Sequence, residues 1–519
     1  MDKDRIVMFG LDCASYNIIN QLIKENKLPN FGKIINNGCF GMLKSVEPVS
    51  SAPAWVSFMT GKNQGKHGIY AWFKTDPKLY NDRGKLLNAF DIDSKTIWEI
   101  LGKKSGCINM PFTYPYFKTT KFMVSGFPRP SFEKAVYPKK LLKELKEYET
   151  EDLPSIKNKT EYLKKIYKND EKVFNLFLYF LNKNKNLDFL CCVIDNLDKM
   201  SHHFWDDEKV LFNYYNHLDK KIGMLLNKLE KNDTLFILSD HGANATPTKK
   251  FYFNKWLKEK GLLKLENKQF FDFGYWMAKL RISKSSLEKV IYKLGLLRFV
   301  AKNISNQNKA KMENMLPPFS YIDWNQTKMY YTKTNAHSPY EGININSKGK
   351  KPKGIVDEKE YEKLRESMIA ELKELKDPNT NKKIVEWVCK REELYKGKHT
   401  KERPDIILKL KEDYTGEIDI KNKLVENFKI SIPGEHHVEG IFMAYGENIK
   451  KEFIKGAELI DVTPTILHML NIPIPSDIDG KVLKIFDKDS DFEKRDVKIN
   501  SKTDIEKEHI NDILKDIKF

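Results

Sequence analysis

The chain has 519 residues, of which 40% are hydrophobic and 12% aromatic, and its formal net charge is +18. This length exceeds what one ordinary hydrophobic core needs, so two or more structural units are expected, and the composition excludes a mostly disordered chain. The 90 Lys and Arg residues are mixed with 72 Asp and Glu residues along the whole length. This mixing favours a solvated, ion-paired surface over nucleic-acid binding as the main role.

Membrane insertion and disulfide bonding are also disfavoured. No apolar run approaches the roughly 18–20 residues that a membrane-spanning helix needs. The first predicted strand begins at residue 5, which leaves no room for a secretory segment. The six cysteines form no CxxC pair, which argues against a zinc ribbon or a disulfide framework. We therefore expect a cytoplasmic protein with reduced thiols and no membrane partner.

Residues 1–245 alternate strand-like and helix-like segments. Short apolar runs predict strands, and apolar residues at helical spacing predict helices. In chain order we expect a strand at 5–11, a helix at 15–25, a helix at 157–183, a strand at 188–194, a helix at 207–230 and a strand at 234–238. This alternation predicts an α/β fold with a mostly parallel central sheet flanked by helices, and residues 1–245 as the N-terminal part of the core.

The alternation is lost in residues 246–400, which we interpret as an inserted cap with helical stretches before residue 330 and an amphipathic helix at 355–376. It returns in residues 401–486, the expected C-terminal part of the core. The elements expected there are strands at 404–408 and 440–444 and a helix at 461–470. The charged segment 487–519 is expected to be a peripheral tail.

Acid and imidazole side chains stand at the ends of several predicted strands or one helical turn apart. They are Asp12, Asp198, His202, Asp240, His241 and His436. Ligands collect at the carboxyl ends of the strands in parallel sheets. Carboxylate oxygens and neutral imidazole nitrogens hold zinc or a similar divalent cation in an open, catalytic site. The pattern therefore predicts a site for two metals.

Each of these residues also has an ordinary explanation. Asp12 could be a helix N-cap, and Asp240 could cap a turn beside a packed histidine. His436 and the adjacent His437 could be loop residues only. Their coincidence at strand edges favours one shared site over several unrelated roles.

Ser51, in Ser51-Ala52-Pro53, is a candidate nucleophile, although serine before Ala-Pro is also ordinary turn chemistry. A hydroxyl becomes a competent nucleophile when a metal holds it as an alkoxide. Two metals roughly 3.5–4 Å apart can stabilise both the attacking and the departing oxygen. The pattern thus predicts phosphoryl or sulfuryl transfer through a covalent seryl intermediate. His67, in a nearby turn, is more typical of a structural residue.

Several motifs together resemble the alkaline phosphatase superfamily. They are Gly10-Leu11-Asp12, Ser51-Ala52-Pro53-Ala54-Trp55, Asp198 with His202, Ser239-Asp240-His241-Gly242, His436 with Gly440, and Asp461-Val462-Thr463-Pro464. The most similar branch is the type I phosphodiesterase/nucleotide pyrophosphatase group, including its predicted phosphohydrolase and phosphomutase members. The motifs span nearly the whole chain in the family's order. The Cys-x-Pro-x-Arg signature of the sulfatases is absent, which argues against that relative.

The resemblance implies a role for each candidate. Ser51 would be the nucleophile and would surround one metal together with Asp12, Asp240 and His241. The other metal would be held by Asp198, His202 and His436. The resemblance implies zinc, and manganese occurs in the mutase relatives.

Two positions depart from the family pattern. Cys13 stands where many relatives have glycine. Trp72 stands near the place of an asparagine that binds a phosphate oxygen in nucleotide-cleaving members, which puts nucleotide cleavage in doubt. Lys62 and Arg129 are candidate substitutes for substrate binding.

The sequence therefore predicts a two-metal phosphohydrolase that cleaves a phosphodiester or phosphomonoester of a small substrate through phospho-Ser51. A phosphomutase of the same superfamily is the first alternative, because a cap that excludes water would favour return of the phosphoryl group to the substrate. A non-catalytic basic binding protein is the second.

Overall fold

The computed structural model describes residues 4–76, 78–80, 84–266, 322–333 and 338–500. It divides into two compact units. The first contains residues 1–72, 87–245 and 432–519, and the second contains residues 73–86 and 246–431. The chain returns to the first unit at residue 432, whereas the sequence placed this return at residue 401. The helical stretches expected before residue 330 fall largely outside the described residues.

Among the described residues, the first unit is built on a nine-stranded sheet with the strand order β20-β2-β19-β9-β1-β8-β5-β6-β7. The strands are β1 (Arg5–Leu11), β2 (Cys39–Lys44), β5 (Ser105–Ile108), β6 (Phe122–Val124), β7 (Val136–Tyr137), β8 (Phe189–Ile194), β9 (Asp233–Leu238), β19 (Glu439–Tyr445) and β20 (Glu452–Glu458). The consecutive strands β9, β1, β8, β5 and β6 are parallel. Strand β19 is antiparallel to its neighbours β2 and β9, and β7 is antiparallel to β6.

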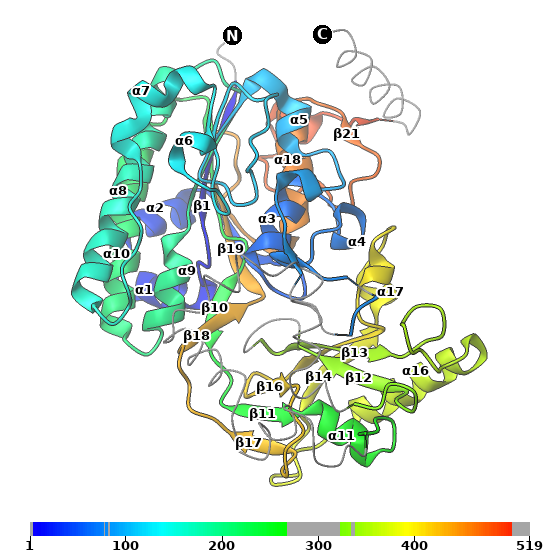
Figure 1. The fold of residues 1–519 in the computed structure, drawn as a ribbon. Helices are drawn as coiled ribbons and strands as arrows, with labels where there is room; N and C mark the ends of the chain where they lie inside the picture. The colour runs from blue at the N-terminus through cyan, green and yellow to red at the C-terminus, as the bar shows by residue number, and fades with distance from the viewer. Residues whose placement is uncertain (1–3, 77, 81–83, 267–321, 334–337, 501–519) are drawn as a thin grey trace. The chain divides into compact units, whose positions relative to one another are not determined.

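Helices cover both faces of this sheet (Figure 1). One face packs on α1 (Tyr16–Lys24), α2 (Pro29–Asn37), α8 (Lys159–Lys183), α9 (Asn196–Phe204) and α10 (Glu208–Leu226). The other packs on α3 (Ser51–Thr60), α5 (Ile97–Leu101) and α18 (Val462–Met469). Val7 and Phe9 of β1 belong to the first core, and Ile6 and Met8 belong to the second. This alternation is the two-residue period of a strand that is buried on both faces.

The predicted fold class is therefore confirmed. The strands expected at 5–11, 188–194, 234–238 and 440–444 are β1, β8, β9 and β19. The helices expected at 15–25, 157–183, 207–230 and 461–470 are α1, α8, α10 and α18. Long apolar runs and clear helical spacing predict such elements well because burial on both sheet faces demands them.

Short elements complete the first unit. They are α4 (Gln64–His67), α6 (Phe132–Ala135), α7 (Leu142–Leu145), β10 (Gly242–Ala245), β18 (Gly434–His437), β21 (Ile474–Pro475), α19 (Asp491–Lys494) and β22 (Ile499–Asn500). Part of the predicted peripheral tail belongs to the unit, since β22 pairs with β21 and Phe492 is only 2% exposed.

The second unit contains two further sheets among its described residues. One has the order β12-β13-β15-β14 and the other β16-β11-β17. These strands are β11 (Lys249–Tyr252), β12 (Met329–Thr332), β13 (Tyr340–Ile345), β14 (Val385–Lys390), β15 (Ile406–Leu410), β16 (Tyr414–Glu417) and β17 (Val425–Asn427). Its other elements are the pair β3 (Phe73–Lys74) and β4 (Lys85–Leu86), and the helices α11 (Phe253–Glu259), α16 (Glu358–Lys373) and α17 (Arg391–Leu394).

Two predicted elements therefore lie in the second unit. The strand expected at 404–408 is β15, which pairs with β13 and β14 and is not part of the central sheet. The helix expected at 355–376 is α16. An apolar run predicts a buried strand but does not tell which sheet it joins, because pairing depends on distant segments.

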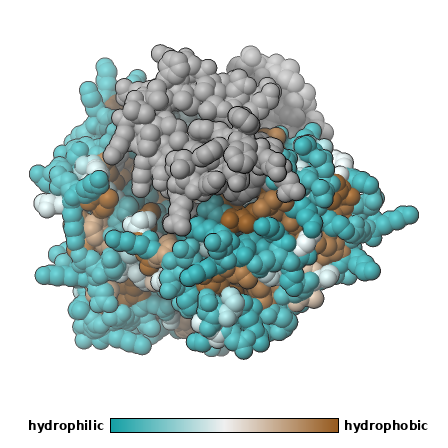
Figure 2. Space-filling view, turned by 60° about the horizontal axis from the view of Figure 1, so that its bottom comes forward, coloured by the Kyte–Doolittle hydropathy of each residue, from teal (hydrophilic) through white to brown (hydrophobic). Residues whose placement is uncertain are grey.

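The described side chains visible in Figure 2 are mostly hydrophilic, with smaller apolar patches between them. Exposed pairs of opposite charge include Lys183 with Glu144 and Lys168 with Glu151. Within the described residues, no helix combines the length and the hydropathy of a membrane span. The mixed charges of the sequence thus form local ion pairs.

Arg5 and Asp233 form a buried ion pair at the start of β1 and β9. Arg5 Nε and Nη2 donate to Asp233 Oδ1 and Oδ2 at 2.7 and 2.6 Å, and Nη1 donates to the carbonyl of Leu181 at 3.1 Å. The residues are 4% and 5% exposed.

We expect Asp233→Ala to lower the free energy of unfolding by about 3–5 kcal/mol, because it leaves the guanidinium buried without its partner. Urea-induced unfolding measures this change. The control is Glu25→Ala, which breaks an exposed pair with Lys27 and should change stability much less, because solvent screens that pair. Equal effects of the two variants would contradict the assigned importance of the buried pair.

Candidate metal centre and active site

The predicted site residues meet at one edge of the central sheet. Strand β1 lies between β8 and β9. Asp12 directly follows β1, Asp240 and His241 follow β9, and Asp198 lies in α9, which begins shortly after β8. Because the three strands are parallel neighbours, their carboxyl ends bring these side chains together.

The first cluster consists of Asp12, Asp240 and His241, whose candidate ligand atoms all lie within 4.8 Å of one another. The three residues are 3%, 0% and 0% exposed. His241 Nδ1 donates to the carbonyl of Gly242 at 3.1 Å. This bond leaves the lone pair on Nε2, which lies 3.3 Å from Asp240 Oδ2 and 3.7 Å from Asp12 Oδ1. A ring fixed in this way is oriented to bind a cation.

Ser51 lies against this cluster at the first residue of α3. Its Oγ is 3.1 Å from His241 Nε2 and 3.5 Å from Asp12 Oδ1. Trp55, one turn further along α3, donates from Nε1 to Asp12 Oδ2 at 3.0 Å. The hydroxyl thus stands at a helix N-terminus, where free backbone N–H groups and the helix dipole favour an anion such as a phosphate group.

The second cluster consists of Asp198, His202 and His436, with candidate ligand atoms again within 4.8 Å of one another. Asp198 Oδ1 is 3.2 Å from His436 Nε2 and 3.4 Å from His202 Nε2. The two Nε2 atoms are 3.0 Å apart. His202 Nδ1 donates to the carbonyl of Gly434 at 2.8 Å, so its Nε2 carries the lone pair. Two ring nitrogens and a carboxylate oxygen therefore converge on one point.

The pairing of two short strands that are distant in the sequence brings the two clusters together. Strand β18 pairs antiparallel with β10, so that His436 lies opposite Ala243. This pairing places the His436 ring 4.1 Å from the His241 ring between centroids. His437 does not join the second cluster; its Nδ1 accepts the backbone N–H of Glu439 at 3.3 Å. The structure thus brings together every residue predicted as a metal ligand, and it selects His436 over His437.

Three carboxylates crowd this region, the buried Asp12 and Asp240 and the half-buried Asp198. Burial, together with the charges of Asp240 and Asp198, raises the pKa of Asp12 well above its ordinary value. Burial and the charge of Asp198 do the same to the pKa of Asp240. Asp240 Oδ2 is buried and has no hydrogen-bond donor among the described residues. Carboxylates crowded in this way are typical of a site that binds cations.

The histidines neutralise part of the negative charge of these carboxylates. Burial alone would raise the pKa of Asp198, but the hydrogen bond from His436 and the charge of His202 lower it. Burial alone would lower the pKa of His436, but Asp198 raises it to about 9. Burial and the charge of His436 hold the pKa of His241 well below its usual value. A neutral His241 and ionised carboxylates suit divalent cations, so the donor set fits two such ions.

The two residues predicted to bind substrate have partners inside the first unit. Lys62 is 4% exposed, and its Nζ lies 2.5 Å from Asp477 Oδ2. Arg129 donates from Nη1 to the carbonyl of Ser125 at 2.8 Å and from Nη2 to Thr150 Oγ1 at 3.0 Å. Neither residue belongs to the two clusters, and their binding of substrate stays a prediction.

His67 is wholly buried. Its Nε2 lies 2.9 Å from Ser57 Oγ, and its Nδ1 accepts the backbone N–H of Ile69 at 3.1 Å. These contacts fasten the turn after α3, as the sequence had suggested.

Sequence reasoning missed the residues that hold α9 in place. Asp195 follows β8 and accepts from Asn109 Nδ2 at 3.2 Å and from Lys199 Nζ at 2.6 Å. Asp170, 1% exposed, accepts from Asn196 Nδ2 at 2.8 Å and from the Tyr214 hydroxyl at 2.5 Å. Asp195 could have been found by the same strand-end rule as Asp12. No local signal marks Asp170, which lies inside a helix.

Comparison with known protein families gives a match across most of the chain. The model of the type I phosphodiesterase/nucleotide pyrophosphatase family matches residues 6–436. The chain belongs to this family. As a type I phosphodiesterase/nucleotide pyrophosphatase family member, it is a phosphoric ester hydrolase. This result confirms the predicted resemblance and disfavours a non-catalytic binding protein. No curated protein matches the chain.

Solved structures of related folds agree with this assignment. An inactive variant of murine ectonucleotide pyrophosphatase/phosphodiesterase 5 in complex with AMP has a TM-score of 0.51 and 14% identity, covering 91% of this chain and 96% of that chain. Phosphonoacetate hydrolase from Sinorhizobium meliloti in complex with phosphonoformate has a TM-score of 0.55 and 12% identity, again covering 91% and 96%. At these identities the likeness shows the fold alone.

The raised pKa of His436 predicts that the stability of this protein, when freed of metal, depends on pH. The folded state holds this proton to about pH 9, whereas an unfolded histidine releases it near 6.5. The stabilisation is therefore complete below pH 6.5 and is lost as the pH rises toward 9, by up to roughly 3 kcal/mol. The depressed pKa of His241 acts below 6.5 and does not affect this window.

Urea-induced unfolding of chelator-treated protein at pH 6.5 and pH 9 measures this loss. His436→Gln should flatten the dependence, whereas His437→Gln should leave it unchanged. Constant stability of the native chain across the window would contradict the assigned pairing of His436 with Asp198.

Proposed function

We propose that this protein is a two-metal phosphohydrolase that cleaves a phosphate ester, with Ser51 as the nucleophile. The observation that carries the proposal is the position of Ser51 Oγ, 3.1 Å from His241 Nε2 and 3.5 Å from Asp12 Oδ1. The hydroxyl thus adjoins the first cluster, and the second cluster lies directly beyond it through the His241 and His436 rings.

Each of the two clusters would hold one cation. Asp12, Asp240 and His241 would hold one cation together with Ser51, and Asp198, His202 and His436 would hold the other. The cations would act as Lewis acids on the attacking and departing oxygens and would activate water. The imidazole ligands, two of them in the second cluster, favour zinc, while manganese is the alternative that the mutase relatives suggest.

Ser51 Oγ attacks phosphorus as its proton departs, and the bond from phosphorus to the leaving oxygen breaks. The leaving group departs as an alcohol, and the phosphoryl group remains on Ser51. Water then attacks phosphorus, breaks the bond to Oγ and restores the hydroxyl. The start of α3 stabilises the phosphate charge during both steps, because its unpaired N–H groups lie at Ser51.

The substrate class of the proposal is a small phosphodiester. Family membership supports a diester, and the fold likeness to a phosphonate hydrolase makes a phosphonate the second candidate. Trp72, at the place of the asparagine of nucleotide-cleaving relatives, packs against Phe112 and Phe127 with ring centroids 5.5 and 5.1 Å away. An aromatic ring donates no hydrogen bond to a phosphate oxygen from its face, so nucleotides lose that contact.

Ser51→Ala should lower kcat/KM for a chromogenic diester on the order of 10³-fold or more, because the nucleophile is lost. Chelation should abolish cleavage by the native chain, and added zinc or manganese should restore it. The matched control is Ser50→Ala, which removes the adjacent buried serine hydroxyl and should change the rate little. Unchanged cleavage in Ser51→Ala with bound metal would refute the covalent mechanism.

A panel of matched substrates separates the candidate reactions. We expect bis-p-nitrophenyl phosphate to be cleaved faster than p-nitrophenyl phosphate, and a nucleotide diester to gain no advantage over it, because Trp72 replaces a phosphate-binding amide. Release of p-nitrophenol reports cleavage of the two esters, and colorimetric detection of inorganic phosphate reports cleavage of a phosphonate. Preference for a phosphonate would favour the second candidate, and isomerisation of a phosphorylated substrate without phosphate release would favour the mutase.

A further inference from the structure

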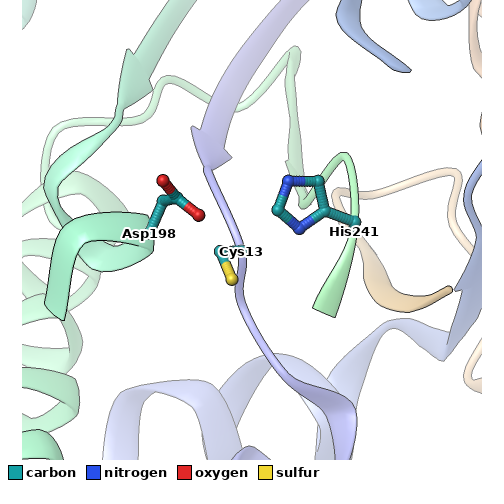
Figure 3. Close-up of side chains that lie close together, drawn as sticks. All are labelled: Cys13, Asp198 and His241. Carbon is teal, nitrogen blue, oxygen red and sulfur yellow. The ribbon is translucent and has the colours of Figure 1, made fainter. Parts of the chain in front are cut away.

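Cys13 lies among the residues of the metal centre, although no proposed role includes it. It directly follows Asp12 and is 1% exposed. Its sulfur, a carboxylate oxygen of Asp198 and a ring nitrogen of His241 all lie within 4.8 Å of one another. Figure 3 shows these three side chains close together, although they come from three separate segments of the chain.

The sulfur lies between the two clusters. Asp198 belongs to the second cluster and His241 belongs to the first. Cys13 Sγ donates to the carbonyl of Gly242 at 3.4 Å, the same carbonyl that accepts from His241 Nδ1. The thiol is therefore fastened to the segment that carries one predicted ligand while it faces the carboxylate of another.

A second observation points to a cation at this place. Asp240 is wholly buried, and its Oδ1 accepts the backbone N–H of Cys13 at 3.3 Å. Its other oxygen, Oδ2, has no hydrogen-bond partner among the described residues. A buried carboxylate oxygen without a donor is costly unless a cation binds it. This oxygen belongs to the residue that holds the Cys13 backbone.

The ordinary explanation is that Cys13 is a small core residue, as buried cysteines usually are. Cys39, Cys107 and Cys191 fit that explanation, since they lie in strands within an apolar core cluster. Cys13 belongs to neither apolar core and is surrounded by Asp12, Asp198 and Asp240. Its φ is 70°, a conformation that favours glycine, so a side chain is kept here at a conformational cost.

We propose that Cys13 is a sulfur ligand of the metal centre and biases this centre toward thiophilic ions of the zinc class over manganese and magnesium. Thiolates select zinc, cobalt and cadmium, whereas oxygen ligands suit manganese and magnesium. On binding, a metal–sulfur bond replaces the S–H bond and the proton passes to solvent. The inference rests on the proposed function, because it concerns the same centre.

The test uses the full-length chain, freed of metal and titrated with Co²⁺ and separately with Cd²⁺. A sulfur ligand produces a ligand-to-metal charge-transfer band in the ultraviolet that oxygen and nitrogen ligands do not. We expect this band in the native chain and its loss in Cys13→Gly. Glycine suits the positive φ, so this variant should fold, and Cys13→Ser provides a second variant that keeps the size of the side chain.

Cys389→Ser is the matched control, because Cys389 lies in β14 of the second unit, and it should keep the band. Competition between Zn²⁺ and Mn²⁺ gives a second readout. We expect Cys13→Gly to lower the ratio of zinc to manganese affinity by about tenfold or more. Cys389→Ser should leave this ratio unchanged.

A metal-loaded native chain without the band, or a band that persists in both Cys13 variants, overturns the inference. An unchanged affinity ratio overturns the selectivity that we assign to it. Failure of the proposed function has a different signature, because cleavage by the manganese-loaded chain and its loss in Ser51→Ala do not depend on sulfur. Cleavage without the band therefore removes only the role of Cys13, whereas a chain that binds no metal removes both.

Discussion

The crowding of three carboxylates, two of them buried, at one edge of the central sheet is the constraint on which the rest of the site depends. Asp12 and Asp240 are at most 3% exposed, and Asp198 lies close enough to raise the pKa of both. His436 compensates part of this charge, because it is hydrogen-bonded to Asp198 and its own pKa is raised. Either protons or bound cations can neutralise such carboxylates, and the nearby imidazole nitrogens complete a donor set that suits divalent cations.

The parallel strands make this concentration of charge possible. Five neighbouring parallel strands, among the described residues, point their carboxyl ends to one edge, and each chain segment there leaves the sheet with free polar groups. The neighbours β9, β1 and β8 place a carboxylate at this edge, and α3 begins with Ser51 beside them. Apolar cores on both faces of the sheet hold the strands rigidly, which keeps the ligand atoms in place.

Much of this arrangement could be predicted from the sequence because its determinants are local. The apolar runs of β1, β8 and β9 are continuous, so their ends, and thus Asp12 and Asp240, could be placed within a residue or two. The spacing of Asp198 and His202 is one helical turn, which predicts a common face of α9. Family motifs supplied the roles that these positions alone left open.

The parts that escaped prediction depend on distant contacts. His436 was predicted as a ligand, but the pairing of β18 with β10 that brings it to the site was not, and neither was the ion pair of the buried Lys62 with Asp477 near the other end of the chain. The strand β15 joins a sheet of the second unit, although its apolar run looks like that of a core strand. Local propensity carries no information on which distant segment completes such a pair.

The surroundings of Cys13 depend both on its neighbour in the sequence, Asp12, and on segments that are distant in the sequence. Its position after Asp12 is visible in the sequence, and there its side chain looks like a tolerated substitution for glycine. Only the fold reveals that α9 and the segment after β9 bring Asp198 and His241 to its sulfur. Cys13, whose φ is positive, donates its backbone N–H to Asp240 Oδ1, and the other oxygen of that carboxylate, Oδ2, has no hydrogen-bond partner among the described residues. A cation bound at this place would give the unpaired carboxylate oxygen a partner, which couples metal loading to the stability of the first unit.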